Sequence, residues 1–357
     1  MSKIVVKIGS NVLTRPDGKP NITNMSALVD QVAHLYAKGH KIVLVSSGAV
    51  ACGKSDVFVK KDLNPVESRQ LYSAVGQIRL INLYAQFFNA YGIVAGQILT
   101  QKENFSSREA YLNQRGCMMT MLENGVIPIV NENDTVSLTE LMFTDNDELS
   151  GLIAAMIDAD VLIILSNIDG IFSGHPDDPG ASLIPSISPE ADLSQFIKVT
   201  KSKHGRGGML TKYNIASKLA AEGVKVIIAK GDRRNVLVDL IEHPEDVPHT
   251  AFIPAVEGLS TVKRWIAHSG SFSKGRIFIN KKASEVLLSD NIVSLLPIGA
   301  IGIEGEWEEG DIVSIYDEEK DKCIAIGKAN LSSLEAGESL GKHGKKPLVH
   351  YDYLYIV

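Results

Sequence analysis

Polar and acidic side chains are concentrated in two short segments near the middle of the chain. Residues 131–134 read Asn-Glu-Asn-Asp, and residues 145–148 read Asp-Asn-Asp-Glu. Side chains of this kind do not build a hydrophobic core, because every buried polar group needs a partner. Their oxygens suit cations and ammonium groups. A turn followed by a helix cap would also explain either segment, since Asn and Asp favour both. Two such segments flanking a short connector favour a binding site.

Two lysines stand close to glycines, in patterns that suit a phosphate. Lys7 lies near the end of an apolar run and precedes Gly9. A lysine in a buried strand is costly unless it meets an anion, although an edge-strand charge is the alternative. Lys212 follows the glycine-rich residues 203–208, and glycines ahead of a helix N-terminus cradle phosphates. A flexible loop followed by a surface lysine is the alternative there.

Residues 48–55 match the phosphate-binding pattern G-x-x-x-x-G-K-[ST] and follow an apolar run. That pattern must open a helix, whereas residues 56–61 are β-branched and charged, and Pro65 follows soon after. We therefore predict that these residues are not a phosphate loop and that Lys54 is dispensable. Ser47 and the turn at Gly48 still suit a carboxylate or phosphate bound through backbone N–H groups.

Strand-like and helix-like segments alternate through most of the chain. Such alternation predicts a layered αβα domain with a mainly parallel central sheet. The carboxyl ends of parallel strands meet at one edge, where ligands bind. Strands are expected at residues 4–8, 41–45, 93–99, 126–130, 161–165 and 224–228, and helices at 24–37, 66–90, 107–123, 147–159 and 209–221.

The character of the chain changes near residue 268. Residues 267–271 resemble a linker, and short β-rich runs at residues 276–279, 311–316 and 323–327 then alternate with glycine and charged turns. We therefore predict a catalytic α/β domain over residues 1–267 and a small β-domain over residues 268–357.

Composition narrows the class of function. The chain has 357 residues and a formal net charge of -6, which argues against a protein built mainly to hold nucleic acid. The N-terminus carries no secretory pattern, and no apolar run approaches a membrane span, so a cytoplasmic protein is expected. The three cysteines are odd in number and far apart, which suggests neither disulfides nor a zinc site.

The motifs resemble those of the amino acid kinase family, in order and spacing, over essentially the whole chain. The C-terminal segment from about Lys274 resembles a PUA domain. The family-like motifs are Lys7-Ile8-Gly9-Ser10, Ser46-Ser47-Gly48-Ala49, residues 131–134, Asp145-Asn146-Asp147 and Gly207-Gly208-Met209 with Lys212.

This resemblance implies transfer of the γ-phosphoryl group of ATP to the side-chain carboxylate of L-glutamate, the first step of proline synthesis. It implies a catalytic set of Lys7, Lys212 and Asp147. It implies glutamate binding by Ser47, Gly48, Ala49, Asp134, Asp145 and Asn146. It implies ATP binding by Lys7, Gly9, Ser166, Asn167, Gly205, Arg206, Gly207, Gly208, Met209 and Lys212. Magnesium is expected on the ATP phosphates, with no direct protein ligand.

Asn167, Arg206 and Thr144 depart from the family pattern, and the first two leave the nucleotide contacts open. The resemblance also implies homo-oligomers and feedback inhibition by proline. RNA binding by the C-terminal domain is not expected, because acidic residues outnumber basic ones from Ser271 onward. Two rival functions remain: a related kinase acting on aspartate, N-acetylglutamate or carbamate, and an RNA-binding protein whose kinase-like part is inactive.

Overall fold

The computed structural model describes most of the chain. The described residues are 1–105, 107–136, 145–174, 178, 180–189, 191, 208–256, 261–289, 293–319 and 322–357. The chain divides into two compact units, Met1–Lys102 with Asn113–Gly258 and Glu103–Leu112 with Leu259–Val357. The exact boundary expected near residue 268 stays a prediction.

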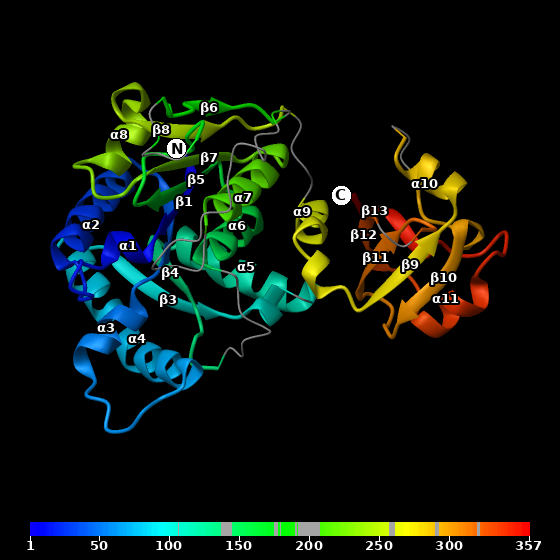
Figure 1. The fold of residues 1–357 in the computed structure, drawn as a ribbon, viewed down its shortest axis with the longest axis horizontal. Helices are drawn as coiled ribbons and strands as arrows, with labels where there is room; N and C mark the ends of the chain where they lie inside the picture. The colour runs from blue at the N-terminus through cyan, green and yellow to red at the C-terminus, as the bar shows by residue number, and fades with distance from the viewer. Residues whose placement is uncertain are drawn as a thin grey trace. The chain divides into compact units, whose positions relative to one another are not determined.

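The first unit is built on an eight-stranded sheet with helices on its faces (Figure 1). Among the described strands every pairing in this sheet is parallel except β7 with β8. The spatial order is β3 (Val94–Thr100), β4 (Val126–Glu132), β2 (Lys41–Ser46), β1 (Lys3–Ile8), β5 (Val161–Ser166), β7 (Lys225–Lys230), β8 (His249–Phe252) and β6 (Ser186–Ile187). The predicted layered α/β domain is confirmed.

The strands form where apolar runs allow burial on both faces. In β1 and β2 every residue after the first is buried, as expected for parallel strands covered by helices. The helices are α1 (Ser10–Leu13), α2 (Ile22–Ala37), α3 (Ala49–Asp56), α4 (Pro65–Asn89), α5 (Arg108–Glu123), α6 (Asn146–Met156), α7 (Met209–Ala221) and α8 (Val236–Glu242).

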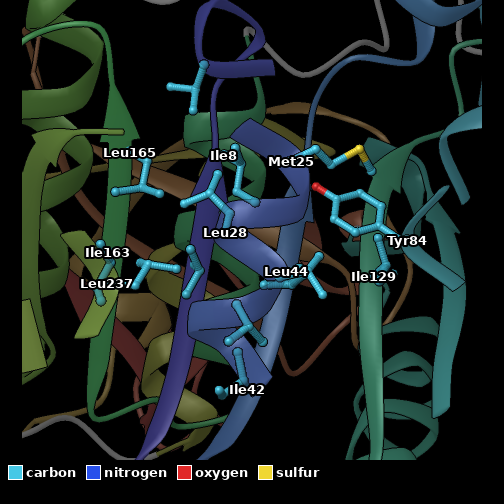
Figure 2. Close-up of a cluster of buried hydrophobic side chains, with 14 of the residues drawn as sticks. Ile8, Met25, Leu28, Ile42, Leu44, Tyr84, Ile129, Ile163, Leu165 and Leu237 are labelled. Atoms are coloured by element: carbon cyan, nitrogen blue, oxygen red, sulfur yellow. The ribbon is translucent and has the colours of Figure 1, made fainter. Parts of the chain in front are cut away.

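One hydrophobic core of this unit lies between one face of the sheet and the helices α2, α4 and α8. Figure 2 shows Ile8, Leu44 and Leu165 from neighbouring strands beside Leu28 of α2. Tyr84 of α4 is fully buried in the same cluster, and its hydroxyl lies 2.8 Å from Ser46 Oγ at the end of β2. Packing of this kind fixes the strand ends, where the polar segments begin.

The second unit contains a five-stranded sheet and its own core. The strand order is β10 (Ala300–Gly305), β9 (Gly275–Ile279), β11 (Ile312–Tyr316), β12 (Cys323–Ala329) and β13 (Val349–Ile356). The core includes Trp307, Ile315 and Val349. The helices are α9 (Thr261–Ala267), α10 (Lys281–Leu287) and α11 (Ser333–Ser339). The predicted β-rich C-terminal domain is confirmed.

The segment predicted as a linker has regular structure. It begins in the last residue of α9 and enters a 3₁₀ turn, Gly270–Phe272. Ser269 is buried, and its hydroxyl donates a hydrogen bond of 2.6 Å to the carbonyl oxygen of Trp265. Small polar residues suggested a flexible connection, but Ser269 instead satisfies a carbonyl group in the last turn of α9, which such a residue can do.

Candidate active site

Two lysines from distant parts of the chain share one buried carboxylate. Lys7 Nζ lies 2.5 Å from Asp147 Oδ1, and Lys212 Nζ lies 2.8 Å from Asp147 Oδ2. The side chain of Asp147 is 1% exposed, while the lysine side chains are 8% and 10% exposed. The structure thus brings together the three residues expected to form the catalytic set, and each lysine reaches a different oxygen of the carboxylate.

Three element ends hold this group in place. Lys7 is the penultimate residue of β1, Asp147 lies in the first turn of α6, and Lys212 lies in the first turn of α7. The helices α6 and α7 pack closely at Gly151, where an added Cβ would lie 2.8 Å from Ile215. Glycine therefore allows the approach that keeps Asp147 within reach of Lys212.

Asp145 caps α6 and so fixes the direction of its first turn. Its Oδ1 accepts hydrogen bonds from the backbone N–H groups of Asp147 and Glu148, at 2.9 and 3.1 Å, the usual role of an N-cap aspartate. Its Oδ2 is buried and has no hydrogen-bond partner among the residues that the structure describes. One oxygen of Asp145 is therefore occupied by structure, while the other is available to a ligand.

Burial and neighbouring charges act in opposite directions on these two acids. Burial by itself raises the pKa of Asp147, but the ammonium groups of Lys7 and Lys212 outweigh burial and hold this pKa well below its usual range. Burial, followed by the negative charge of Asp147, raises the pKa of Asp145 to about 6. Asp147 thus stays ionised near neutral pH, because its two cationic neighbours favour the charged form.

A cleft opens beside the lysines and collects many of the expected site residues. An added Cβ at Gly9 would lie 3.4 Å from Lys7 Nζ and 3.2 Å from the carbonyl oxygen of Leu165, so only glycine leaves this space open. The lining residues are Lys7, Gly9, Ser10, Asn11, Val12, Ser47, Asp145, Asn146, Asp147, Leu165, Ser166, Asn167 and Lys212. Ser10 and Asn11 were not predicted as site residues, although their place directly after β1 was a usable signal.

A chain of amide and hydroxyl groups runs from the end of β2 to the end of β4. Asn146 Nδ2 donates to Ser47 Oγ at 2.9 Å and to Asn131 Oδ1 at 3.1 Å. Asn131 Nδ2 in turn donates to Gln77 Oε1 of α4 at 3.0 Å. Ser47 and Asn146, both expected to bind glutamate, therefore meet directly, and Asn131 connects them to β4.

Asp134 does not line the cleft. Its Oδ1 pairs with Arg69 of α4, and its Oδ2 accepts from the hydroxyl of Ser73 at 3.3 Å. Arg69 also pairs with Glu132, 3.0 Å away. Arg69 was not predicted as a site residue, because a single arginine within a long helix carries no local signal.

Residues 48–55, which match the phosphate-loop pattern, form no loop. Gly48 has φ +106° and caps α3, and α3 contains the rest of the pattern. Gly53 of α3 faces Gly76 of α4, where an added Cβ on either residue would lie within 2 Å of the opposite backbone. Lys54 is exposed near the end of α3. The glycine of this pattern therefore serves the close contact between α3 and α4. Ala49, which was expected to bind glutamate, is buried in the first turn of α3.

The expected nucleotide contacts are described only in part. Ser166 is the last residue of β5 and Asn167 follows it. Both line the cleft, and Ser166 Oγ donates to Asn167 Oδ1 at 3.3 Å. Gly208 caps α7, and Met209 begins it, but neither lines the cleft. Gly205, Arg206, Gly207 and Thr144 lie outside the described residues.

The described ranges contain neither a metal-binding cluster nor a membrane-spanning helix. No group of three or more His, Cys, Asp or Glu side chains there could hold a metal ion. No described helix is both long and apolar enough to pass through a bilayer.

Two family models match the chain. The model of the amino acid kinase family matches residues 2–230, and that of the PUA domain matches residues 275–351. The first match covers more than half of the chain and contains every residue of the cleft. The second falls within the five-stranded unit.

Relatives and solved structures agree with these matches. A glutamate 5-kinase of Bacteroides thetaiotaomicron is 59% identical over 355 residues, covering 99% of this chain and 98% of the relative. A glutamate 5-kinase of Chlorobaculum tepidum is 44% identical, covering 99% and 97%. A carbamate kinase from Giardia lamblia bound to AMP-PNP superposes with a TM-score of 0.52 at 17% identity, covering 71% of this chain and 99% of that one. This last likeness shows the fold alone.

Proposed function

Because this chain belongs to the amino acid kinase family, we propose that its cleft joins ATP and L-glutamate through the shared lysine–aspartate–lysine group. The chain has the activity of a glutamate 5-kinase: it phosphorylates the side-chain carboxylate of L-glutamate with ATP, the first step of proline biosynthesis. The observation that carries the assignment of roles is the pair of contacts from Lys7 and Lys212 to Asp147, at 2.5 and 2.8 Å.

The reaction needs charge neutralisation more than it needs proton transfer. An oxygen of the glutamate carboxylate attacks the γ-phosphorus, the bond to the β,γ-bridging oxygen breaks, and ADP leaves with that electron pair. The acceptor is already ionised near neutral pH, so no general base is required. The barrier lies in bringing two anions together in line, which positioned cations lower.

The two lysines are proposed to lie along the path of the phosphoryl group. Lys7 would stabilise negative charge from the β1 side of the cleft, and Lys212 from the α7 side. Asp147 would keep the two ammonium groups close without their repelling each other, because its charge lies between them. Asp147 is a positioning residue in this scheme, since it touches the lysines and not the reacting atoms.

The acceptor would lie toward β2 and β4. Asn146 Nδ2 is already used by Ser47 and Asn131, which leaves its Oδ1 to accept from the α-ammonium group of glutamate. Asp145 Oδ2, which has no partner within the described ranges, offers a second acceptor. Asp134 would add negative charge on the same side, and Gly48 and Ala49 backbone contacts at the start of α3.

ATP would lie on the other side, along β1 and β5. The open space at Gly9 suits a phosphate close to Lys7. Ser166, Asn167, Gly208 and Met209 are proposed as nucleotide contacts, together with Gly205, Arg206 and Gly207. Magnesium held by the phosphate oxygens would neutralise part of their charge.

A trapping assay tests the acceptor. Purified protein is incubated with ATP, magnesium, hydroxylamine and one carboxylate at a time, and the hydroxamate formed from an acyl phosphate is measured. We expect hydroxamate with L-glutamate and none above background with aspartate, N-acetylglutamate or carbamate. Hydroxamate from aspartate or N-acetylglutamate but not from glutamate would overturn the assignment.

Homo-oligomers and feedback by proline remain proposals that rest on the family.

A further inference from the structure

Two buried hydroxyl groups lie behind the turn that carries Ser47. Ser46, the last residue of β2, and Tyr84 of α4 are both fully buried, and Figure 2 shows Tyr84 within the apolar cluster. Tyr84 Oη lies 2.8 Å from Ser46 Oγ, and Ser46 Oγ donates to the carbonyl oxygen of Ser47 at 3.0 Å. A serine hydroxyl has one hydrogen to give, so Tyr84 is the donor to Ser46. A chain of hydrogen bonds thus runs from Tyr84 through Ser46 to the backbone of Ser47.

Burial gives this chain a fixed direction. It raises the pKa of the Tyr84 hydroxyl well above its usual range, so the group keeps the proton that it donates. Phenylalanine would fill the same apolar space without the cost of burying a hydroxyl group. The oxygen of Tyr84 therefore serves the bond to Ser46 and not the packing of the core.

The chain of hydrogen bonds holds the backbone of Ser47 from one side, and β1 holds it from the other. The N–H group of Ser47 donates to the carbonyl oxygen of Ile8 at 3.1 Å, while its own carbonyl oxygen accepts from Ser46. Both planar peptide groups that flank the Cα atom of Ser47 are thereby held. Their orientation fixes the direction of the Cα–Cβ bond, and with it the point from which the Ser47 side chain enters the cleft.

The hydroxyl group of Ser47 is left with a hydrogen to donate. Ser47 lines the cleft, and its Oγ accepts a hydrogen bond of 2.9 Å from Asn146 Nδ2. Among the described residues, the hydroxyl hydrogen of Ser47 meets no acceptor. A hydroxyl group can accept and donate at the same time. Ser47 therefore presents a positioned donor to the cleft, and a carboxylate is the ligand group that such a donor binds most strongly.

We propose that Tyr84 and Ser46 are positioning residues for Ser47, and that they orient its hydroxyl group to donate to a carboxylate of the acceptor. Both act through the backbone of Ser47 and neither touches the acceptor. Without either hydroxyl the carbonyl group of Ser47 is held less firmly, and the donor at Oγ loses its fixed position. This inference rests on the proposed function, since it assumes that the acceptor is a carboxylic acid bound beside Ser47.

The first test is Y84F, which removes one oxygen atom and leaves the ring in place. We expect the KM for glutamate to rise about three- to tenfold, as expected for the loss of one ordinary hydrogen bond. The kcat and the KM for ATP should stay within about twofold of wild type, because uniform binding of the acceptor is what changes. S46A should act in the same direction. Steady-state kinetics measure both variants.

The decisive test is a double-mutant cycle with S47A. If Tyr84 acts through the hydroxyl group of Ser47, Y84F raises the KM for glutamate in wild type but not further in the S47A background. A general loss of support would raise it by the same factor in both. Should turnover of S47A be too slow, the affinity for glutamate is measured by isothermal titration calorimetry. Should Y84F fail to fold, S46A takes its place in the same cycle.

Y36F is the matched control for the loss of a tyrosine hydroxyl group. Tyr36 lies in the same unit, and its hydroxyl donates to the carbonyl oxygen of Gly125 at 3.0 Å. Gly125 directly precedes β4, and neither residue lines the cleft. We expect Y36F to leave the KM values for glutamate and ATP at their wild-type levels.

Three results would overturn the inference: an unchanged KM for glutamate in Y84F, equal rises for glutamate and ATP, or an equal effect of Y84F with and without Ser47. The proposed function fails in a different way, since wild-type protein would then form no hydroxamate from glutamate. If wild type forms it and the cycle shows no coupling, only the roles of Tyr84 and Ser46 are wrong.

Discussion

At the scale of single residues, the site combines one shared carboxylate with two lysines of different origin. Lys7 lies on a strand and Lys212 on a helix, and both contact Asp147. A lysine ammonium group is a compact charge that can follow a moving phosphate. Removing either lysine leaves a buried carboxylate with one cationic partner instead of two.

Lys212→Ala tests the charge that the α7 lysine supplies. We expect kcat to fall by about two to three orders of magnitude, because a fixed charge at the transferring group is lost. Lys54→Ala is the control, since Lys54 is exposed on α3 and lies outside the cleft, and it should retain wild-type kcat. Steady-state kinetics with glutamate and ATP measure both. Loss of activity in Lys54→Ala, with Lys212→Ala active, would contradict this assignment.

Asn146→Ala tests the acceptor side of the cleft. It removes the donor to Ser47 and Asn131 and the proposed acceptor for the ammonium group. We expect the KM for glutamate to rise about tenfold, in line with the loss of one or two hydrogen bonds to a charged group. The KM for ATP should change little. A glutamate KM equal to that of wild type would place Asn146 outside the acceptor site.

Asp145→Asn tests the raised pKa of Asp145. Burial raises this pKa to about 6, so the folded protein holds a proton that the unfolded chain releases at lower pH. Ionising Asp145 therefore costs stability as pH rises through this range. Asparagine caps a helix equally well but does not ionise. We expect the variant to gain up to about 3 kcal/mol on wild type between pH 4 and pH 6.5, as measured by urea unfolding. A constant difference across this range would contradict the shift.

At the scale of elements, α3 and α4 are in unusually close contact. An added Cβ at Gly76 would lie 1.8 Å from the carbonyl oxygen of Ala49 and 2.3 Å from the backbone nitrogen of Gly53. This approach holds the start of α3, and with it Gly48, against the helix that carries Arg69. Helices α3 and α4, which lie on the proposed acceptor side, are therefore joined through backbone contact.

Gly76→Ala tests that contact. We expect a loss of about 1–3 kcal/mol or more in the free energy of unfolding, because neither backbone can move without disturbing the packing. Gly116→Ala is the matched control in α5, since an added Cβ there meets nothing within 4 Å. It should gain about 0.4–1 kcal/mol by restricting the unfolded chain. Urea unfolding measures both variants, and a neutral Gly76→Ala would argue against the close contact.

Sequence patterns predicted most elements of the first unit because apolar runs and helical periods are local signals. The predicted strand at residues 41–45 and helix at 209–221, for example, agree with β2 and α7. Helix α3 was missed, since it depends on glycines that meet a second helix only after folding. Site residues at strand ends, such as Lys7 and Ser47, were found because the apolar runs show where the strands end. The contacts of Arg69 were missed because they join it to residues more than 60 positions away in the sequence.

At the scale of the whole molecule, each unit has its own hydrophobic core. The second unit matches the PUA domain, yet its sequence is acidic in balance, with Glu304, Glu306, Glu308 and Glu309 close together. Phosphate backbones bind where lysine and arginine are in excess. The composition of this unit therefore favours a role in regulation or assembly over one in holding RNA.

Filter binding with single-stranded and duplex RNA tests this expectation on the full chain. We expect no retention at about 0.15 M salt at protein concentrations below about 10 µM, because non-specific binding of this kind depends on released counterions. A basic RNA-binding protein serves as the positive control. Tight retention that weakens steeply as salt rises would contradict the expectation and revive the RNA-binding alternative.

Lys7, Asp147 and Lys212 form a bridge of two ion pairs within the protein itself. Long lysine side chains normally lose considerable rotational freedom when they become ordered, and here folding has already ordered them. In the proposed scheme the lysines that would handle phosphate are ordered by Asp147, whereas Ser47 and Asn146, proposed to bind the acceptor, are ordered by each other and by Asn131. A protein engineer seeking a different acyl acceptor can therefore leave the bridge intact and redesign only the ends of β2 and β4.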